Sequence, residues 1–256
     1  MAEALIGGII NGGIVSKEEV FVSEPISERR SYLENTYGLR ATNNNVEILD
    51  KAALVVLAIK PQVISEVMAD IKDAVRNNQT ILSIVAGITS SSLEEGLDHN
   101  LIIRVMPNTP AQIGQGMSMW TASRDVPHEI KEITGAMLNT LGEEIYVPDE
   151  KLIDMATALS ASGPAYVFLF IEALIDAGTY LGMNREMARQ LVLQTVIGSA
   201  ELVRKSGRHP AELKDMVTSP GGTTIEALRA LESAGLRSAI FEGVIQAFQK
   251  SKTLGG

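Results

Sequence analysis

The sequence predicts an α/β domain over residues 1–148, followed by an all-helical domain over residues 149–256. Two observations support this division. Up to about Pro148, short runs rich in β-branched residues alternate with polar helical stretches, whereas the strand signal disappears after Glu150. In the second part, clusters of Gly and Pro separate apolar-periodic segments, which is typical of helices joined by turns.

Two runs in the first part, Leu54–Ile59 and Ile81–Ala86, are apolar at nearly every position. Strands that are buried on both faces have this pattern, as in a parallel sheet covered by helices. Between the two runs, apolar residues spaced three and four apart predict a helix over Pro61–Arg76, which completes a βαβ unit. The other predicted strands are Val20–Val22, Leu101–Met106, Gly116–Ala122 and Glu144–Val147.

Small residues and prolines follow these predicted strands, at Ala58–Pro61, Val85–Gly87 and Met106–Pro110. The carboxyl ends of neighbouring parallel strands form crevices that bind nucleotides, and such residues let a flat ligand lie against the backbone. Ordinary strand-to-helix turns have the same composition. From the residues alone, a cofactor site and plain turns are both open interpretations.

The helices predicted in the second part are Leu152–Leu159, Ala165–Leu181, Arg185–Lys205, Ala211–Thr218 and Thr224–Ser233. Ala165–Leu181 is apolar on almost every side, interrupted only by Glu172 and Asp176 on one face. Such a helix needs burial all round, and a domain this small buries few helices completely. A helical dimer interface is therefore favoured over a purely intramolecular core.

Composition narrows the class of protein. The 256 residues include 22 basic and 31 acidic ones, so the formal net charge is −9, which disfavours binding to nucleic acid or to an anionic membrane. The unbroken apolar runs are too short for a membrane span and no basic leader is visible, so a cytoplasmic protein is expected. The chain has no cysteine and only three scattered histidines, so no metal site is predicted.

A loop rich in glycine and threonine, Thr218–Thr224, precedes the last predicted helix. Gly221 and Gly222 let the backbone approach a ligand, and the following helix start presents free N–H groups to a carboxylate or phosphate. Thr223 and Thr224 add hydroxyl donors. The alternative is a well-capped helix start, because threonine is common at the N-cap. Ser162 lies in a similar break, Ser162-Gly163-Pro164, before the apolar helix.

Four stretches resemble pyrroline-5-carboxylate reductases: Ala58–Pro61, Arg104–Pro110, Leu159–Tyr166 and Leu213–Leu228. They stand in the family's order and cover essentially the whole chain, and the Ser-Pro-Gly-Gly-x-Thr segment is highly specific. The resemblance implies a Rossmann domain followed by an all-helical domain that forms a homodimer, and family members often assemble further into pentamers of dimers. It also implies reduction of 1-pyrroline-5-carboxylate to L-proline by hydride transfer from NADPH or NADH, the last step of proline biosynthesis.

The resemblance also implies the site residues. Those expected to bind the dinucleotide are Ser23, Asn45, Ala58, Ile59, Lys60, Pro61, Ile84, Val85 and Ala86. Those expected to bind the substrate are Ser162, Gly221, Gly222, Thr223 and Thr224. Thr224 matches the threonine usually proposed as the hydrogen-bond or proton donor to the ring nitrogen, so it is the expected catalytic residue.

The cofactor expected from these residues is NADPH, with NADH as the alternative. Ser23 is expected near the 2′-phosphate and Asn45 near the adenosine part. Glu24 is ambiguous, because an acid at this position suits a free ribose diol. Arg29 and Arg30 could compensate for it.

The chain departs from the family at its start. Members read strand, Gly-x-Gly-Asn-Met-Ala, helix, whereas Met1-Ala2 resembles the end of that turn and leads straight into an apolar helix. We therefore expect a reductase that starts about a dozen residues late, or a truncated copy, with weakened NADPH binding. The alternatives are a non-catalytic homologue that acts as an assembly or regulatory partner, and another small imine or keto-acid reductase.

Overall fold

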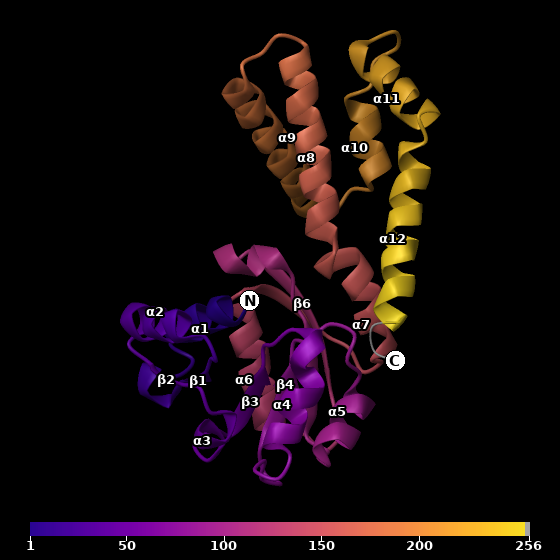
Figure 1. Cartoon of the computed structure of the whole chain (residues 1–256). Coiled ribbons are helices and arrows are strands. Elements are labelled where there is room, and N and C mark those ends of the chain that lie inside the picture. The colour runs from indigo at the N-terminus through magenta and orange to yellow at the C-terminus, as the bar shows by residue number, and fades with distance from the viewer. Residues whose placement is uncertain (254–256) are drawn as a thin grey trace. The chain divides into compact units, whose positions relative to one another are not determined.

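The computed structural model describes residues 1–253, which form two compact units. The first unit contains Met1–Ser162 together with residues 247–253, and the second contains Gly163–Gln246. Figure 1 shows the sheets in the first unit and only helices in the second. The first unit continues past the predicted boundary at residues 148 and 149, because α7 (Lys151–Ala156) is tied to the sheet by ion pairs described below.

A small parallel sheet opens the first unit. β1 (Phe21–Ser23) pairs with β2 (Arg40–Thr42), and α2 (Ser27–Tyr37) connects the two strands. α3 (Asn45–Leu49) follows β2, and the Asn44 side chain caps it by accepting from the N–H groups of Val46 and Glu47. β2 is absent from the sequence prediction, because three residues with Arg40 at their head are too short and polar to show an alternating pattern.

The larger sheet has five strands, in the order β3 (Leu54–Leu57), β4 (Thr80–Ser83), β5 (Ile102–Met106), β6 (Gly116–Ala122) and β7 (Gly142–Tyr146). β3, β4 and β5 are parallel, as predicted. β6 runs antiparallel to β5, since the segment containing η3 (Thr109–Ile113) turns the chain back, and β7 is parallel to β6. Hydrophobic patterning reports burial rather than strand direction, so this reversal was not predicted.

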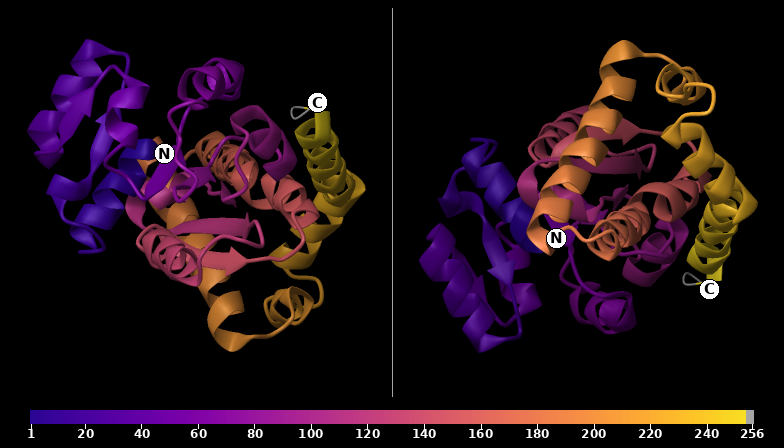
Figure 2. Two further views of the ribbon diagram at one scale, coloured as in Figure 1. Left: turned by 90° about the horizontal axis from the view of Figure 1, so that it is seen from below. Right: turned by 90° about the horizontal axis from the view of Figure 1, so that it is seen from above.

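Helices cover both faces of the larger sheet (Figure 2). On one face, α4 (Ile64–Ile71) and α5 (Ser90–Leu97) pack against Ile81 and Ile102. On the other, α1 (Ala2–Asn11) and α6 (His128–Asn139) pack against Leu82 and Ile103. β4 is buried throughout, as predicted, and so is β5. The same prediction is wrong for β3, where Val56 is exposed because β3 is an edge strand.

α1 is the element that joins the two sheets. Leu5 packs into the core of the larger sheet, and Ile6 packs into the cluster under the smaller one. Gly8 and Gly12 approach Thr140 so closely that a Cβ on either would lie less than 3.0 Å from that side chain. Helix packing therefore explains these glycines. Within residues 1–253, β1 and β3 each pair on one side only.

The Glu3 carboxylate links α1 to α2. It accepts hydrogen bonds from the Arg29 guanidinium and from the hydroxyls of Tyr32 and Tyr37, at 2.8 and 3.2 Å for the two tyrosines. The bond from Arg29, followed by that from Tyr32, lowers the pKa of Glu3 below its ordinary value. A lowered folded-state pKa contributes stability above the unfolded-state pKa of about 4.3, and this contribution is lost as the pH falls through the folded-state value.

Glu3→Gln is therefore expected to lower the melting temperature at pH 7, by an amount corresponding to about 1 kcal/mol or less because the pair is partly exposed. The difference from the unmodified chain should shrink as the pH falls below about 4. Thermal melts at the two pH values measure this, with Glu28→Gln at an exposed position of α2 as the matched control. A penalty that does not change with pH would contradict the role given to the carboxylate.

The second unit is built from α8 (Gly163–Tyr180), α9 (Arg185–Ser206), α10 (Pro210–Met216), α11 (Thr223–Ser233) and most of α12 (Leu236–Thr253). α12 was not predicted. α8 and α9 pack side by side as a helical hairpin (Figure 1). No residue of α8 is buried, and Phe168 is 61% exposed. The apolar helix predicted to need burial on every side is thus only partly covered within its own chain, where α9 packs against it.

Candidate active site

The residues expected to bind the dinucleotide lie at the carboxyl ends of strands. Ser23 ends β1, opposite Thr42 of β2, and Asn45 starts α3 just beyond β2. Ala58–Pro61 follow β3, and Ile84–Ala86 follow its parallel neighbour β4. The fold thus places these residues in two groups, one at the end of each sheet.

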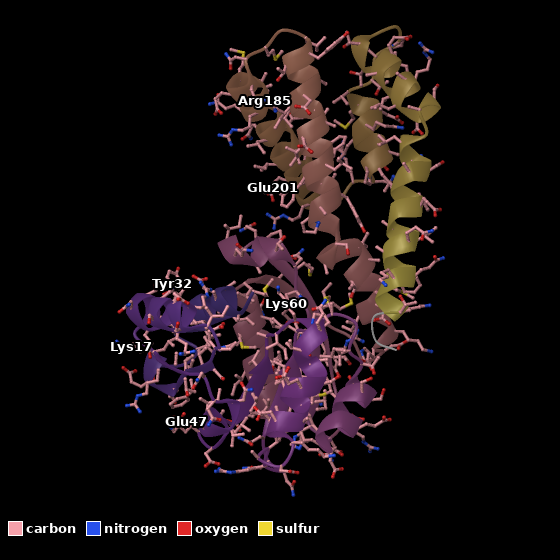
Figure 3. All side chains as sticks on the ribbon, viewed as in Figure 1. Lys17, Tyr32, Glu47, Lys60, Arg185 and Glu201 are labelled. Carbon is pink, nitrogen blue, oxygen red and sulfur yellow. The ribbon has the colours of Figure 1, made fainter. Side chains whose placement is uncertain are left out.

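Polar side chains are available in both groups. The Asn45 amide donates to the Asp70 carboxylate at 2.9 Å, which holds it at the start of α3. Lys60 precedes the short helix η2 (Pro61–Val63) and is exposed (Figure 3). Its ammonium has no ion pair among residues 1–253, so it is free to meet a phosphate.

The loop after β5 is joined to the segment that ends at Ser162. Asn108 accepts from the Met117 N–H at 2.9 Å, and its amide nitrogen lies 3.3 Å from the Ser160 hydroxyl. The chain from Thr157 to Ala161 is a π-turn, closed where the Ser162 N–H donates to the Thr157 carbonyl at 2.9 Å. Such turns are frequent at functional sites. The apolar spacing in the sequence predicts an ordinary helix over Leu152–Leu159 here, and the π-turn corrects its last three residues.

Ser162 therefore lies at the same end of the sheet as the cofactor residues that follow β4. Ala86 and Ala161 both pack on a small cluster formed by Met106, Val147 and Ile153. Asn108 was not predicted as a site residue, although it lies in one of the four matched stretches. Its neighbours in the sequence gave no indication of its contact with Ser160.

Arg104 is the buried charge beneath this arrangement. It lies in the middle of β5 and is only 1% exposed. Its guanidinium pairs with Glu150 and Asp154 of the α7 region, at 2.9 Å in each case, and Glu150 also accepts from the Ser90 N–H and hydroxyl. The signal in the sequence is one charged residue, Arg104, inside an otherwise apolar strand. Because buried charges are paired, such a residue indicates that acidic partners lie nearby in the fold.

The expected substrate loop lies in the second unit, where Gly222 is the N-cap of α11. Thr223 and Thr224 are thus the first two residues of the helix, so the alternative of a helix start capped by threonine is wrong. Within the described residues, neither threonine hydroxyl has a hydrogen-bond partner, and Thr224 is half-buried while Thr223 is exposed. The N–H groups at the start of α11 and two hydroxyls are left available to a ligand.

The two glycines of this loop have separate backbone reasons. Gly221 is in the left-handed region, with φ of +65°. A Cβ on Gly222 would collide with the Ser219 side chain. The positive φ therefore favours glycine at 221, whereas a side chain at 222 would require Ser219 to move.

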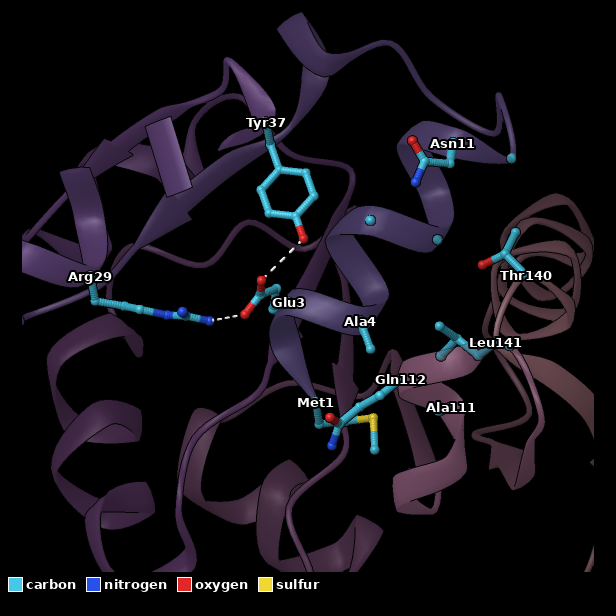
Figure 4. Close-up of a pocket in the computed structure, with 14 residues that line it drawn as sticks. Met1, Glu3, Ala4, Asn11, Arg29, Tyr37, Ala111, Gln112, Thr140 and Leu141 are labelled. Carbon is cyan, nitrogen blue, oxygen red and sulfur yellow. Dashed lines mark hydrogen bonds and ion pairs between the residues drawn. The ribbon is translucent and has the colours of Figure 1, made fainter. Parts of the chain in front are cut away.

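A separate open pocket of about 680 Å³ runs along α1 (Figure 4). Its walls include Glu3 and Arg29 on one side and Thr140 and Leu141 on the other. Three glycines of α1, Gly7, Gly8 and Gly12, also line it. None of the residues expected to bind cofactor or substrate lines it. Arg29 and Glu3, which line it, form an ion pair and neutralise each other's charge.

Comparisons with known proteins agree with this geometry. A family model for pyrroline-5-carboxylate reductase dimerisation matches residues 150–254, and one described as coenzyme F420-dependent NADP oxidoreductase matches residues 1–87. The pyrroline-5-carboxylate reductase of a Synechocystis strain is 42% identical over all of this chain and 95% of its own length. The chain belongs to the pyrroline-5-carboxylate reductase family.

A solved structure supports the same assignment. Pyrroline carboxylate reductase from Plasmodium falciparum, with NADP bound, matches with a TM-score of 0.91 and 37% identity over 99% of this chain and 94% of that one. The reductase of Methanosarcina acetivorans is 37% identical over 100% of this chain and 94% of its own length. The predicted family, the Rossmann-type domain with a helical second part and the NAD(P)H-dependent oxidoreductase activity are confirmed. These relatives carry the name of an enzyme, so nothing supports the non-catalytic alternative.

Proposed function

We propose that this chain reduces 1-pyrroline-5-carboxylate to L-proline with a nicotinamide cofactor, preferring NADPH, and that Thr224 acts at the ring nitrogen. Membership of the family supports the reaction, and the uncapped start of α11 with its two unpartnered hydroxyls supports the residue roles. The acidic, cysteine-free composition fits a cytoplasmic location.

The donor set of the first unit fits a dinucleotide. Ser23 and Asn45 lie at the ends of β1 and β2, where an adenosine part would be held, and Lys60 supplies a free cation near the phosphates. Ala58, Ile59, Pro61 and Ile84–Ala86 provide the backbone surface at the ends of β3 and β4. When bound, the cofactor supplies the hydride.

The chain's own part in the reaction is binding and orientation. The N–H groups of α11 and its positive dipole end suit the substrate carboxylate, with Gly221 and Gly222 giving access to the backbone. As the imine carbon accepts the hydride, the ring nitrogen accepts one proton through the Thr224 hydroxyl, and solvent water then reprotonates that hydroxyl. Thr223 and Ser162 supply further donors to the substrate. Holding a small ring in this way needs no strong base or nucleophile.

Thr224→Ala tests this assignment. Loss of one hydrogen bond at a desolvated site is worth about 1–3 kcal/mol, so kcat/KM for pyrroline-5-carboxylate should fall about 5- to 150-fold. Thr224→Ser keeps the hydroxyl and should retain most of the activity, and the affinity for NADPH should be the same in all three proteins. Steady-state kinetics and calorimetric NADPH titration measure both quantities. Unchanged turnover in Thr224→Ala would remove Thr224 from the mechanism.

We further propose that a second copy of the chain covers the apolar surface of the second unit. The stretch Lys151–Tyr180 is long and apolar enough to span a membrane by length and composition alone, a test that core helices also pass. The dimerisation model matches residues 150–254, which include this stretch, and so favours a homodimer. Light scattering of the purified chain would also separate a dimer from the pentamer of dimers that the family resemblance implies.

A further inference from the structure

Two adjacent arginines in the first turn of α2, beside the turn that follows β1, have different partners. The Arg29 guanidinium is paired with Glu3, and its central carbon lies 4.8 Å from the centre of the Tyr32 ring. Arg30 instead spans the turn, where one terminal nitrogen, Nη1, donates to the Glu24 carbonyl at 2.7 Å and to the Pro25 carbonyl at 2.9 Å. Arg30 is thereby anchored at the end of β1, beside the segment that carries Ser23.

The anchored guanidinium keeps donors to spare. An arginine has five N–H groups in a planar fork, and the two carbonyls engage only those of Nη1. Within residues 1–253, Nε and Nη2 of Arg30 have no partner. This edge of the fork has the geometry that binds a phosphate through two parallel hydrogen bonds.

Glu24, the acidic residue at the same turn, is hydrogen-bonded to nearby backbone groups. The Glu24 carboxylate accepts from the Ile26 N–H at 3.0 Å, and the Glu24 N–H donates to the Thr42 carbonyl at 2.8 Å. In sites that select NADH, an acid after this strand accepts from the free ribose 2′-hydroxyl. Glu24 already satisfies one of its oxygens at the start of α2, whereas Arg30 has donors free.

We propose that Arg30 is the residue that determines cofactor specificity, binding the adenosine 2′-phosphate together with the Ser23 hydroxyl. This inference rests on the proposed function, because it concerns the adenosine end of the same cofactor site. Backbone carbonyls hold the guanidinium before any ligand arrives, so little side-chain entropy is lost on binding. Arg29 has no such role, because Glu3 neutralises it.

The experiment uses Arg30→Gln, with Arg29→Gln as the matched control on the neighbouring residue. Calorimetric titration with adenosine 2′,5′-bisphosphate and with adenosine 5′-monophosphate isolates the contribution of the 2′-phosphate. Loss of charge-assisted hydrogen bonds should weaken bisphosphate binding by Arg30→Gln about 10- to 100-fold and leave monophosphate binding unchanged. Arg29→Gln should leave the ratio of the two affinities as it is in the unmodified chain.

Kinetics with each cofactor add a second readout. The kcat/KM for NADPH should fall in Arg30→Gln by the same factor as bisphosphate affinity, while that for NADH stays the same. If Arg30→Gln does not fold, Arg30→Lys takes its place, because a lysine keeps the charge but loses the two-carbonyl anchor, and it should lower the bisphosphate affinity selectively. Equal losses for both nucleotides would show that Arg30 only stabilises the turn, and would overturn the proposal.

The two proposals fail differently. An unmodified chain that reduces pyrroline-5-carboxylate with neither cofactor would contradict the proposed function, while the nucleotide titrations would still test Arg30. An active chain whose preference survives in Arg30→Gln would overturn the specificity assignment alone.

Discussion

Phe168→Asp is expected to abolish the homodimer. Phe168 lies in α8 with 61% of its surface exposed in the single chain, in a helix that has no buried residue. Burying a phenylalanine is worth about 1.5–3 kcal/mol, and placing an unpaired charge in a dry interface costs several kcal/mol more. Because each subunit of a two-fold dimer contributes the substituted residue, the energetic cost applies twice. Dimer affinity should therefore fall by more than about 1000-fold.

Sedimentation and light scattering at micromolar concentration measure this result as a shift from dimer to monomer, or to aggregates that form through the exposed helices. Ile113→Asp is the matched control, because Ile113 is an apolar residue 78% exposed in the first unit, outside the dimerisation match. It should leave the oligomeric state unchanged. A folded, monodisperse monomer of the unmodified chain would contradict the dimer.

Arg104→Met is expected to destabilise the first unit by about 3 kcal/mol. Removing one partner of a buried ion pair costs about 3–5 kcal/mol, and the lower end applies because Glu150 and Asp154 remain partly accessible to water. The arginine joins β5 to α7, and Glu150 continues the network to Ser90 at the start of α5. Urea unfolding followed by circular dichroism gives the free energy of unfolding.

The compensating variant carries Arg104→Met, Glu150→Gln and Asp154→Leu. Removing all three charges leaves no unpaired acid at the buried strand, so much of the lost stability should return. An Arg104→Met protein as stable as the unmodified chain would show that the network contributes nothing.

Hydrophobic patterning predicted the parts of the fold that depend on burial. The apolar run at Leu54–Ile59 contains β3, the run at Ile81–Ala86 contains all of β4 except Thr80, and Gly116–Ala122 is β6 to the residue. The apolar helix now seen as α8 was expected to be buried in a dimer interface rather than fully within its own domain. In the single chain no residue of α8 is buried and Phe168 is 61% exposed, which agrees with this expectation. Period and burial are local properties, so a sequence carries them directly.

Features that depend on partners distant in the sequence were not predicted. The reversal of β6 and the π-turn at Thr157–Ala161 arise from pairing and packing that no local pattern shows. The same limit applies to Arg104, whose acids lie far along the chain. For Arg29 and Arg30 the sequence showed two equivalent cations, and only the structure separates the one that Glu3 neutralises from the one anchored on the turn.

Reduction of 1-pyrroline-5-carboxylate can be measured directly on the purified, folded chain. The assay supplies this substrate with saturating NADPH and follows both NADPH oxidation and proline formation. We predict substrate-dependent oxidation of NADPH that matches proline mole for mole and falls in Thr224→Ala. A folded dimer that binds NADPH but forms no proline would contradict this account and favour the non-catalytic alternative.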